Sequence, residues 1–378
     1  MMSQNAIFYL TVMCICQSSW KTMKRNPVLC GVLTACIVLF CISVHQSLGP
    51  EPVHFEKCRM ASDSPWLVEN TTNLGMNISE LTECDVSMTV VTAFFDIGTF
   101  QKGPHGNFSF SLYHDWAASF QYLRNPLVVY TDSVPFRNRI AHLRYQLKES
   151  TKIIFIKTKS LWSWNMIDEM KELFSKPWYP KYHPNTVIPE YAAAQHAKYA
   201  VVSDAITRNF FQTEFYSWVD VGYFRDLSNK KPFVLVPPRG FRRNRVGANV
   251  VGHKPARDPN IKDIFYKNLF WVGGGMFFGV ADVLLNFTRQ YETAVRMLMN
   301  MKLAGTDQQV LYSMFSKEGR RLLKPKIELH LFYPKDEMNG HTNDWFYLGY
   351  YCLREVHFVP SAKLLQSQWD LSENTTES

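Results

Sequence analysis

The sequence has no Cys-x-x-Cys pair, no Cys/His zinc spacing, no glycine-rich dinucleotide fingerprint and no P-loop lysine. These absences argue against a structural zinc, a dinucleotide-binding domain and a P-loop NTPase. No Ser/His/Asp or paired-carboxylate pattern indicates a hydrolase. The net charge of +8 is moderate and, apart from one arginine cluster, dispersed, and no nucleic-acid-binding motif is present. We therefore expect no nucleic acid partner.

Cysteine is scarce after residue 41, because five of the eight cysteines lie at or before it. The others are Cys58, Cys84 and Cys352. This odd number allows at most one internal disulfide and leaves a thiol that is either buried or paired between chains.

Long uncharged runs are also scarce, and residues 28–44 form the run that is long enough to cross a membrane. It is directly preceded by three basic residues, Lys21, Lys24 and Arg25, whereas residues 45–56 contain no Lys or Arg. This charge bias predicts a signal-anchor over residues 28–46, with a cytosolic tail at 1–27 and all later residues in the lumen or outside. A cleaved signal peptide is the alternative.

Glycosylation sequons agree with this topology, because all of them follow the apolar run: Asn70, Asn77, Asn107, Asn286 and Asn374. We expect N-glycans at some of these sites. The polar residues 47–85 are typical of a luminal stem, and residues 361–378 of a loose C-terminal tail. The chain is therefore predicted to be a single-pass type II protein of the Golgi or endoplasmic reticulum membrane.

Residues 86–360 have the pattern of one folded domain, and 46% hydrophobic and 15% aromatic residues are ample for a core. Buried-strand patterns at residues 88–95, 127–130, 153–156 and 215–219 alternate with helical patterns at 111–123 and 191–211. We predict an α/β fold with a single mixed, mostly parallel sheet flanked by helices. Further on, we expect strands at 233–236, 271–279 and 328–332, helices at 281–301 and 306–315, and an exposed loop after Pro238.

Acidic residues follow three of the predicted strands: Asp96, Asp132 and Asp220. The carboxyl ends of parallel strands meet at one edge of a sheet, where ligands of open α/β proteins bind. Asp220 therefore either faces a metal or a phosphate-bearing ligand, or caps the turn before Gly222. Asp132 either contacts a ligand at this edge or is a turn residue.

Two further elements are candidates for the site. Gly274 lies at the centre of a glycine triplet in a bulky strand, which marks either a close approach by a ligand or a bulge. Thr306 and Gln309 form a capping box that opens the helix at 306–315. Asp307, in the first turn of that helix, either orients or deprotonates an acceptor hydroxyl, or only complements the helix dipole.

An arginine cluster occupies the loop bounded by proline and glycine: Arg239, Arg242, Arg243 and Arg245. The forked donors of arginine match phosphate oxygens, so Arg239 and Arg242 are candidates for binding a diphosphate. A solvated basic loop is the alternative. Lys198, on the predicted helix before the Asp220 strand, is a weaker candidate for the same role. Several tryptophans are either aromatic anchors of the core and loops or candidates for stacking on a flat ligand face: Trp162, Trp164 and Trp178.

Six segments together resemble the HtrL/YibB family, in the order of that family: MTVVTAFFDIG, LVVYTD, EYAAAQHAKYAVVSDAI, FYSWVDVGYFR, FWVGGGMFFG and GTDQQVLYSMF. The resemblance covers about residues 86–350. It implies a glycosyltransferase domain of GT-A type, in which a nucleotide-sugar lies over the first strands and an acidic motif holds a divalent metal.

The resemblance implies roles for several residues. Thr92, Phe94 and Asp96 are expected to line the base and ribose pocket, although Phe94 is equally explained as a core residue. Asp132 is a candidate for binding ribose hydroxyls. Mn²⁺ or Mg²⁺ is expected at Asp220, because hard cations prefer carboxylate oxygens. The sequence departs from the usual Asp-x-Asp motif, since residue 222 is glycine. Either one carboxylate suffices, or metal is not used, or a second ligand comes from a later residue: His330, His341 or Asp344.

The predicted function is transfer of a sugar from a nucleotide-sugar donor to a hydroxyl of a glycan or glycoconjugate acceptor, with a metal assisting departure of the nucleoside diphosphate. The alternative is a non-catalytic luminal protein for carbohydrate binding or adhesion on a decayed transferase fold. The missing second acid is the main argument for this alternative.

Overall fold

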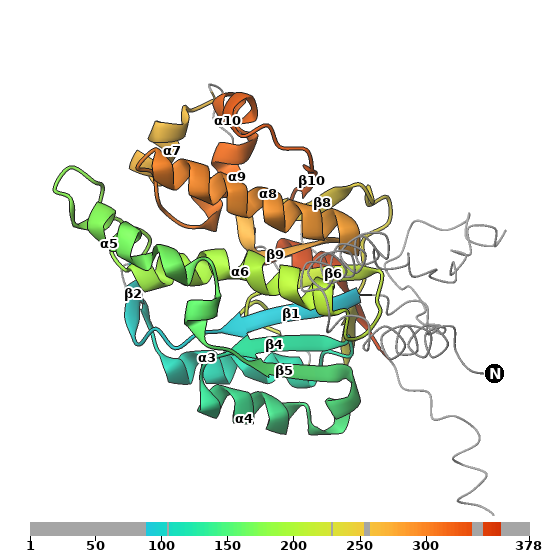
Figure 1. Ribbon diagram of the computed structural model, residues 1–378. Helices are drawn as coiled ribbons and strands as arrows, with labels where there is room; N and C mark the ends of the chain where they lie inside the picture. Colours follow the sequence, from blue (N-terminus) through green and yellow to red (C-terminus); the bar gives the residue numbers. More distant parts are fainter. Residues whose placement is uncertain (1–87, 104–105, 228–229, 253–257, 335–342, 357–378) are drawn as a thin grey trace, which may run out of the picture. The chain divides into compact units, whose positions relative to one another are not determined.

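The structure is a computed structural model that describes residues 88–103, 106–227, 230–252, 258–334 and 343–356 (Figure 1). Its centre is a seven-stranded sheet with the strand order β10-β8-β9-β6-β1-β4-β5. The strands are β1 (Met88–Phe94), β4 (Leu127–Thr131), β5 (Thr151–Phe155), β6 (Phe215–Val219), β8 (Arg245–Val250), β9 (Val272–Val280) and β10 (Glu328–Phe332). β9 runs antiparallel to both of its neighbours, and all other pairs are parallel. The predicted mixed, mostly parallel α/β sheet is confirmed.

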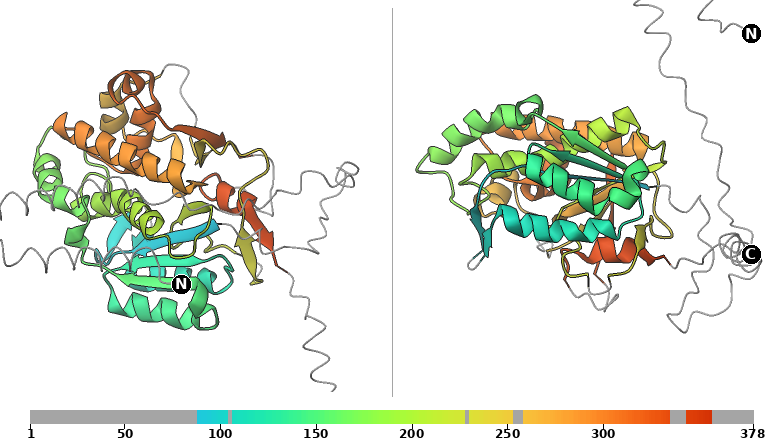
Figure 2. Two further views of the ribbon diagram at one scale, coloured as in Figure 1. Left: turned by 45° about the vertical axis from the view of Figure 1, so that its right-hand side comes forward. Right: turned by 90° about the horizontal axis from the view of Figure 1, so that it is seen from below.

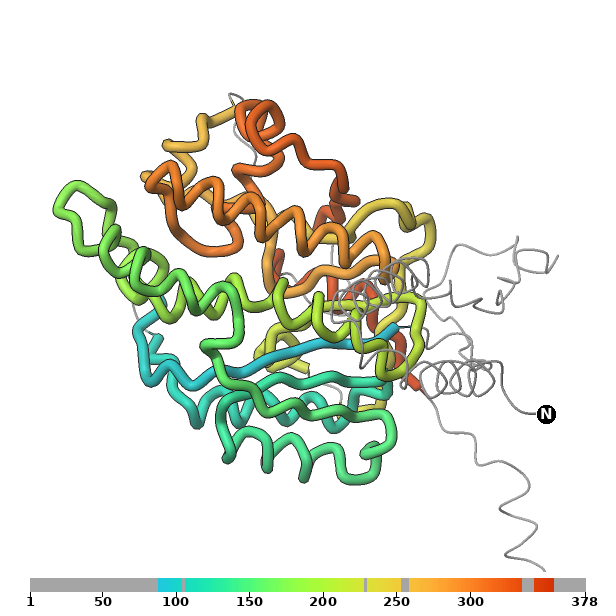
Figure 3. The backbone as a smooth tube through the Cα atoms, in the orientation of Figure 1, coloured from blue at the N-terminus to red at the C-terminus, as the bar shows by residue number. Residues whose placement is uncertain are grey.

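Two small sheets complete the strands. β2 (Phe100–Lys102) and β3 (Gly106–Phe108) form an antiparallel hairpin. β7 (Phe233–Leu235) pairs with β11 (Leu353–Glu355), so the strand predicted at 233–236 exists but lies outside the main sheet. Figure 3 shows the hairpin beside the first part of α6 (Pro189–Arg208), where the Phe100 and Tyr191 rings are 5.1 Å apart.

Helices cover both faces of the sheet because successive strand side chains point to opposite sides. Val91 of β1 and the following residue Phe95 join one core with α6 and α8 (Ala281–Asn300), and Val90 and Phe94 of β1 join the other. The right-hand view of Figure 2 shows α6 (lime green) on one side of the sheet and α11 (red) on the other. The remaining helices are α3 (Phe110–Trp116), α4 (Val134–Leu143), α5 (Ile167–Ser175), α7 (Ile261–Tyr266), α9 (Asp307–Phe315), α10 (Lys317–Leu322) and α11 (Tyr347–Cys352), with 3₁₀ turns at Ala117–Gln121, Tyr145–Ser150, Thr158–Ser160 and Trp164–Met166.

The sequence did not predict β8, which we expected to be part of an exposed loop. Its residues Val246–Val250 are buried. The strand lacks bulky signals because a Cβ on Gly247 would lie 2.5 Å from the Phe278 ring of the neighbouring strand. Packing therefore requires the small residue that weakens the strand pattern.

The membrane and stem predictions fall outside the described residues. These regions are 1–27, 28–46, 47–85 and 361–378, together with Cys58, Cys84, Asn70, Asn77 and Asn374. In the described part of the chain, no helix is long and apolar enough to span a bilayer. Asn107 and Asn286 are exposed, as glycan sites must be, and Cys352 is a buried free thiol.

A buried histidine on α6 makes stability depend on pH. His196 lies 2.7 Å from the Tyr291 hydroxyl, and burial lowers the pKa of its imidazole to about 3. The unfolded chain protonates this group near pH 6.5, so it binds more protons than the native state between these values. Stability is therefore full above about pH 6.5 and falls as the pH drops toward 3.

We predict that wild type loses about 2 kcal/mol of unfolding free energy between pH 6.5 and 5 through this group, and that His196→Gln loses less over the same range. Urea titrations at both pH values measure the difference. The exposed His142→Gln is the control and should behave like wild type. An equal loss of unfolding free energy between pH 6.5 and 5 in wild type and His196→Gln would contradict this assignment.

Candidate functional site

An acid follows each of three neighbouring strands. Because these strands are parallel, the three acids lie at the same edge of the sheet. β1, β4 and β6 are followed by Asp96, Asp132 and Asp220, respectively. The backbone amide of Asp96 donates to Asp132 Oδ1 at 3.0 Å. Burial raises the pKa of the Asp132 carboxyl, and this residue supports the strand ends rather than lining the adjacent cavity.

Lys198 on α6 connects the site. Its buried Nζ lies 3.1 Å from Asp220 Oδ1, 3.1 Å from Asp307 Oδ2 and 2.9 Å from the Gly274 carbonyl oxygen. Burial opposes the charge of Lys198, but the two carboxylates outweigh it and raise the pKa of its ammonium. Since an ammonium has three N–H donors, these three acceptors use all of them. Lys198 is therefore a bridge between two acids and has no donor left for a phosphate.

The first turn of α9 places Asp307 in this bridge. The predicted capping box is present, with Gln309 Oε1 accepting from the Thr306 amide at 3.1 Å. Asp307 is 1% exposed, and its Oδ1 is buried without a hydrogen-bond partner among the described residues. A buried carboxylate oxygen of this kind is costly unless a ligand or water donates to it.

Gly274 is the reason that Asp307 fits. A Cβ at this position would lie 1.9 Å from Asp307 Oδ2, inside van der Waals contact. The glycine triplet of β9 was predicted to admit a ligand, and the structure shows that Gly274 instead admits a carboxylate of the protein. Its neighbour Gly275 lines the cavity.

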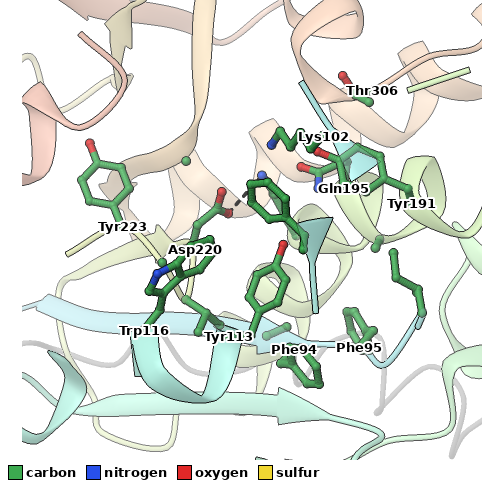
Figure 4. Close-up of a pocket in the computed structure, with 18 of the residues that line it drawn as sticks. Phe94, Phe95, Lys102, Tyr113, Trp116, Tyr191, Gln195, Asp220, Tyr223 and Thr306 are labelled. Carbon is green, nitrogen blue, oxygen red and sulfur yellow. Dashed lines mark ion pairs between the residues drawn. The ribbon is translucent and has the colours of Figure 1, made fainter. Parts of the chain in front are cut away.

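The cavity next to these acids has a volume of about 430 Å³ and lies at the carboxyl ends of β1 and β6 (Figure 4). Its charged lining residues are Asp96, Lys102, Lys198, Asp220, Arg225 and Asp307. Its aromatic lining residues are Phe94, Phe95, Phe100, Phe108, Phe110, Tyr113, Trp116, Tyr191, Trp218, Tyr223, Trp345 and Phe346. In Figure 4, Asp220, Trp116 and Tyr223 lie across the cavity from Lys102 and Tyr191. A ligand here meets flat apolar surfaces and charges of both signs.

Asp220 is the open member of the bridged pair of acids, since its side chain is 42% exposed and that of Asp307 is 1% exposed. The indole Nε1 of Trp218 donates to its Oδ1 at 2.7 Å, so Lys198 and Trp218 share that oxygen. Asp220 Oδ2 has no hydrogen-bond partner in the part of the chain that the structure describes. The carboxylate is thus fixed through one oxygen and free to bind through the other.

The structure also explains why residue 222 is not an acid. A Cβ on Gly222 would lie 2.5 Å from the Trp116 ring. The space that a second side chain of an Asp-x-Asp motif would need is therefore filled by an indole. The same indole contacts the guanidinium of Arg225, whose carbon lies 4.8 Å from its ring centre.

Several predicted site residues lie elsewhere. Arg243 pairs with Glu214 directly before β6, whereas Asp220 directly follows β6, so the arginine cluster and Asp220 are separated by about 20 Å of strand. The Arg242 amide donates to His330 Nδ1 at 3.0 Å. His330 lies on β10, three strands from β6 and about 14 Å away. The structure therefore does not bring Arg239, Arg242 or His330 to Asp220.

The remaining predicted residues divide between the cavity and the core. Phe94 and Asp96 line the cavity as expected. Thr92 is fully buried within β1 and does not reach it. His341 lies outside the described residues, and Asp344 is not among the described residues that line the cavity.

Sequence reasoning missed Lys102, Arg225, Trp116 and Tyr113. Arg225 follows the Asp220 motif closely, and this proximity was the available signal. Lys102 reaches the cavity through the β2–β3 hairpin, which no strong local pattern predicts. The tryptophans proposed for stacking, Trp162, Trp164 and Trp178, are not among the residues that line the cavity.

The fold and the cavity define a class: an α/β protein with a polar and aromatic ligand site at the carboxyl ends of parallel strands. The chain belongs to the HtrL/YibB family, because the family model described as "Bacterial protein of unknown function (HtrL_YibB)" matches residues 86–322. The family predicted from the six segments is confirmed. A comparison with curated proteins found no match to the chain.

We predict that Gly274→Ala removes Asp307 from Lys198 and lowers the unfolding free energy by about 3–5 kcal/mol, the usual cost of breaking a buried ion pair. The control is Gly279→Ala on the same strand, where the nearest atom to an added Cβ is 3.5 Å away. Urea unfolding measures both variants. The control should change by about 1 kcal/mol or less, and similar losses in the two variants would refute the role of Gly274.

Proposed function

We propose that this protein is a glycosyltransferase of GT-A type that moves a sugar from a nucleotide-sugar donor to a hydroxyl of a glycan or glycoconjugate. The observation that supports this proposal most strongly is the cavity itself. It joins a bridged pair of acids to a wall of aromatic rings at the sheet edge where α/β proteins bind ligands. Aromatic rings suit the stacking of a nucleobase or a sugar face. We further propose that the protein is a type II membrane protein of the Golgi or endoplasmic reticulum.

Sugar transfer requires two bond changes at the anomeric carbon and the loss of one proton from the acceptor oxygen. The acceptor oxygen forms a bond to the anomeric carbon, the bond from that carbon to the diphosphate oxygen breaks with its electron pair, and the proton of the acceptor hydroxyl passes to a carboxylate or to water. In our proposal Asp307 Oδ1, which lacks a partner among the described residues, accepts a hydrogen bond from a substrate hydroxyl. Lys198 orients Asp307 through the 3.1 Å contact between its Nζ and Asp307 Oδ2.

A divalent cation fits this site through Asp220. The part of the chain that the structure describes contains no group of three His, Cys, Asp or Glu side chains that could hold a metal ion. Mn²⁺ or Mg²⁺ that keeps waters and binds diphosphate oxygens needs only one or two carboxylates, and Asp220 Oδ2 offers one. The ammonium of Lys198 already lies between Asp220 and Asp307, so these acids do not form a shared metal site. When bound, the cation would neutralise charge on the departing diphosphate.

A non-catalytic carbohydrate-binding protein is the second candidate. The specific observation in its favour is that Trp116 fills the space beside Gly222, which leaves one acid in the motif and adds an aromatic surface. Such a protein would bind glycan but not nucleoside diphosphate, so nucleotide binding separates the two candidates.

We predict that the full-length chain, kept in detergent because residues 28–44 are apolar, binds UDP or GDP in the presence of Mn²⁺. Asp220→Asn should weaken this binding about tenfold or more, since a charge-assisted contact is worth about 1.5–3 kcal/mol. Isothermal titration calorimetry measures the affinities, with the exposed Asp168→Asn as the matched control. Unchanged affinity in Asp220→Asn would refute the assignment of Asp220, and glycan binding without any nucleotide binding would favour the second candidate.

A further inference from the structure

The donor of the proposed reaction is a diphosphate ester, so its binding requires positive charge in the cavity. Three of the described lining residues are cationic: Lys102, Lys198 and Arg225. Lys198 directs all of its N–H donors to protein acceptors. It offsets one of the two carboxylates that it bridges and so reduces their repulsion of an anion. Direct contacts to phosphate must come from the other two cations.

Arg225 lies close to two aromatic rings. Its guanidinium carbon lies 4.8 Å from the centre of the Trp116 ring and 4.5 Å from that of Phe346. Its ion pair with Asp226 uses Nε at the long distance of 3.8 Å. The terminal nitrogens therefore have no ion pair in the described part of the chain. Contact with aromatic rings does not use the N–H donors of a guanidinium in an ion pair, and these donors match phosphate oxygens in pairs.

This arrangement depends on Gly222, because any side chain there would displace the Trp116 ring that supports Arg225. Gly222, the residue that departs from the Asp-x-Asp motif, therefore allows Trp116 to contact Arg225. Loss of the second acid and support of Arg225 are two consequences of one glycine.

Lys102, on the β2–β3 hairpin, also lies over two aromatic rings. Its Nζ lies 5.7 Å from the centre of the Phe108 ring and 5.6 Å from that of Tyr191, and both rings line the cavity. No ion pair involves Lys102 among the described residues. Its ammonium is exposed and held over aromatic surface, as is typical of a cation available to a ligand.

Lys102 and Arg225 line the same cavity and both interact electrostatically with Tyr113. Burial raises the pKa of the Tyr113 phenol, and Lys102 and Arg225 both oppose this shift. Figure 4 places Tyr113 between Trp116, on which Arg225 stacks, and the side of the cavity where Lys102 lies. The two cations therefore both lie near Tyr113 on the lining of one cavity.

We propose that Lys102 and Arg225 bind the diphosphate of the nucleotide-sugar donor directly, so that nucleoside diphosphate binds this protein without a divalent metal. This inference rests on the proposed function and adds to it the groups that hold the leaving diphosphate. It assigns to these two residues the role that the sequence suggested for Arg239 and Arg242.

The test compares wild type with Lys102→Met and Arg225→Met as full-length chains. Calorimetry with UDP and GDP is performed in EDTA and again in Mn²⁺. We expect binding in EDTA, weakened about tenfold or more by each substitution, and competition by inorganic pyrophosphate. Arg239→Met, which removes an exposed cation of the arginine cluster, is the matched control and should bind like wild type. Arg225→Lys should be intermediate, because it keeps the charge but loses the stacked plane.

The outcomes separate this inference from the function on which it rests. Binding that requires Mn²⁺ and is unaffected by both substitutions would overturn the inference and leave the proposed transferase intact. Absence of UDP and GDP binding in both conditions, with a cooperative unfolding transition showing that the protein is folded, would overturn the proposed function as well. Each substitution removes cation–π contacts at a partly exposed site, so urea unfolding of the variants should lie within about 1 kcal/mol of wild type.

Discussion

One buried ammonium determines the arrangement of this site. Lys198 joins Asp220, Asp307 and the Gly274 carbonyl, which belong to three elements far apart in the sequence. Two carboxylates so close would repel each other strongly in a buried setting, and the ammonium between them removes that repulsion. The bridge holds the end of β6, the start of α9 and the middle of β9 close together. These three segments form one wall of the cavity.

Glycine is as important to the site as the charged residues. Gly274 leaves room for the Asp307 carboxylate, and Gly222 leaves room for the Trp116 ring. In both places an added Cβ would overlap a side chain rather than strain the backbone. The two glycines are therefore needed where another side chain of the protein packs closely. The sequence shows that the side chain is missing at these positions, but it does not show which residue fills the space.

The strands of the first half and the helix that begins at Asp307 were predictable, because aromatic and β-branched runs and a capping box are local signals. The edge shared by Asp96 and Asp220 followed from parallel strand order. The position of the arginine cluster was not predictable, because β8 was not recognised. The start of β8 at Arg245 lies at the end of the sheet opposite to Asp220. Lys198 was assigned to phosphate because a sequence does not show that buried acids use its donors. Lys102 and Arg225 depend on tertiary stacking, which leaves no periodic pattern.

Release of nucleoside diphosphate from a panel of nucleotide-sugars tests the central claim most directly. The full-length chain and its Asp307→Asn variant are incubated with each donor and a mixed glycan acceptor, and the freed UDP or GDP is quantified. We predict release from at least one donor by wild type, and a loss of at least about 100-fold in Asp307→Asn, which corresponds to about 2.7 kcal/mol. Release at equal rates by both proteins, or none from any donor by a protein that binds the nucleotide, would contradict it.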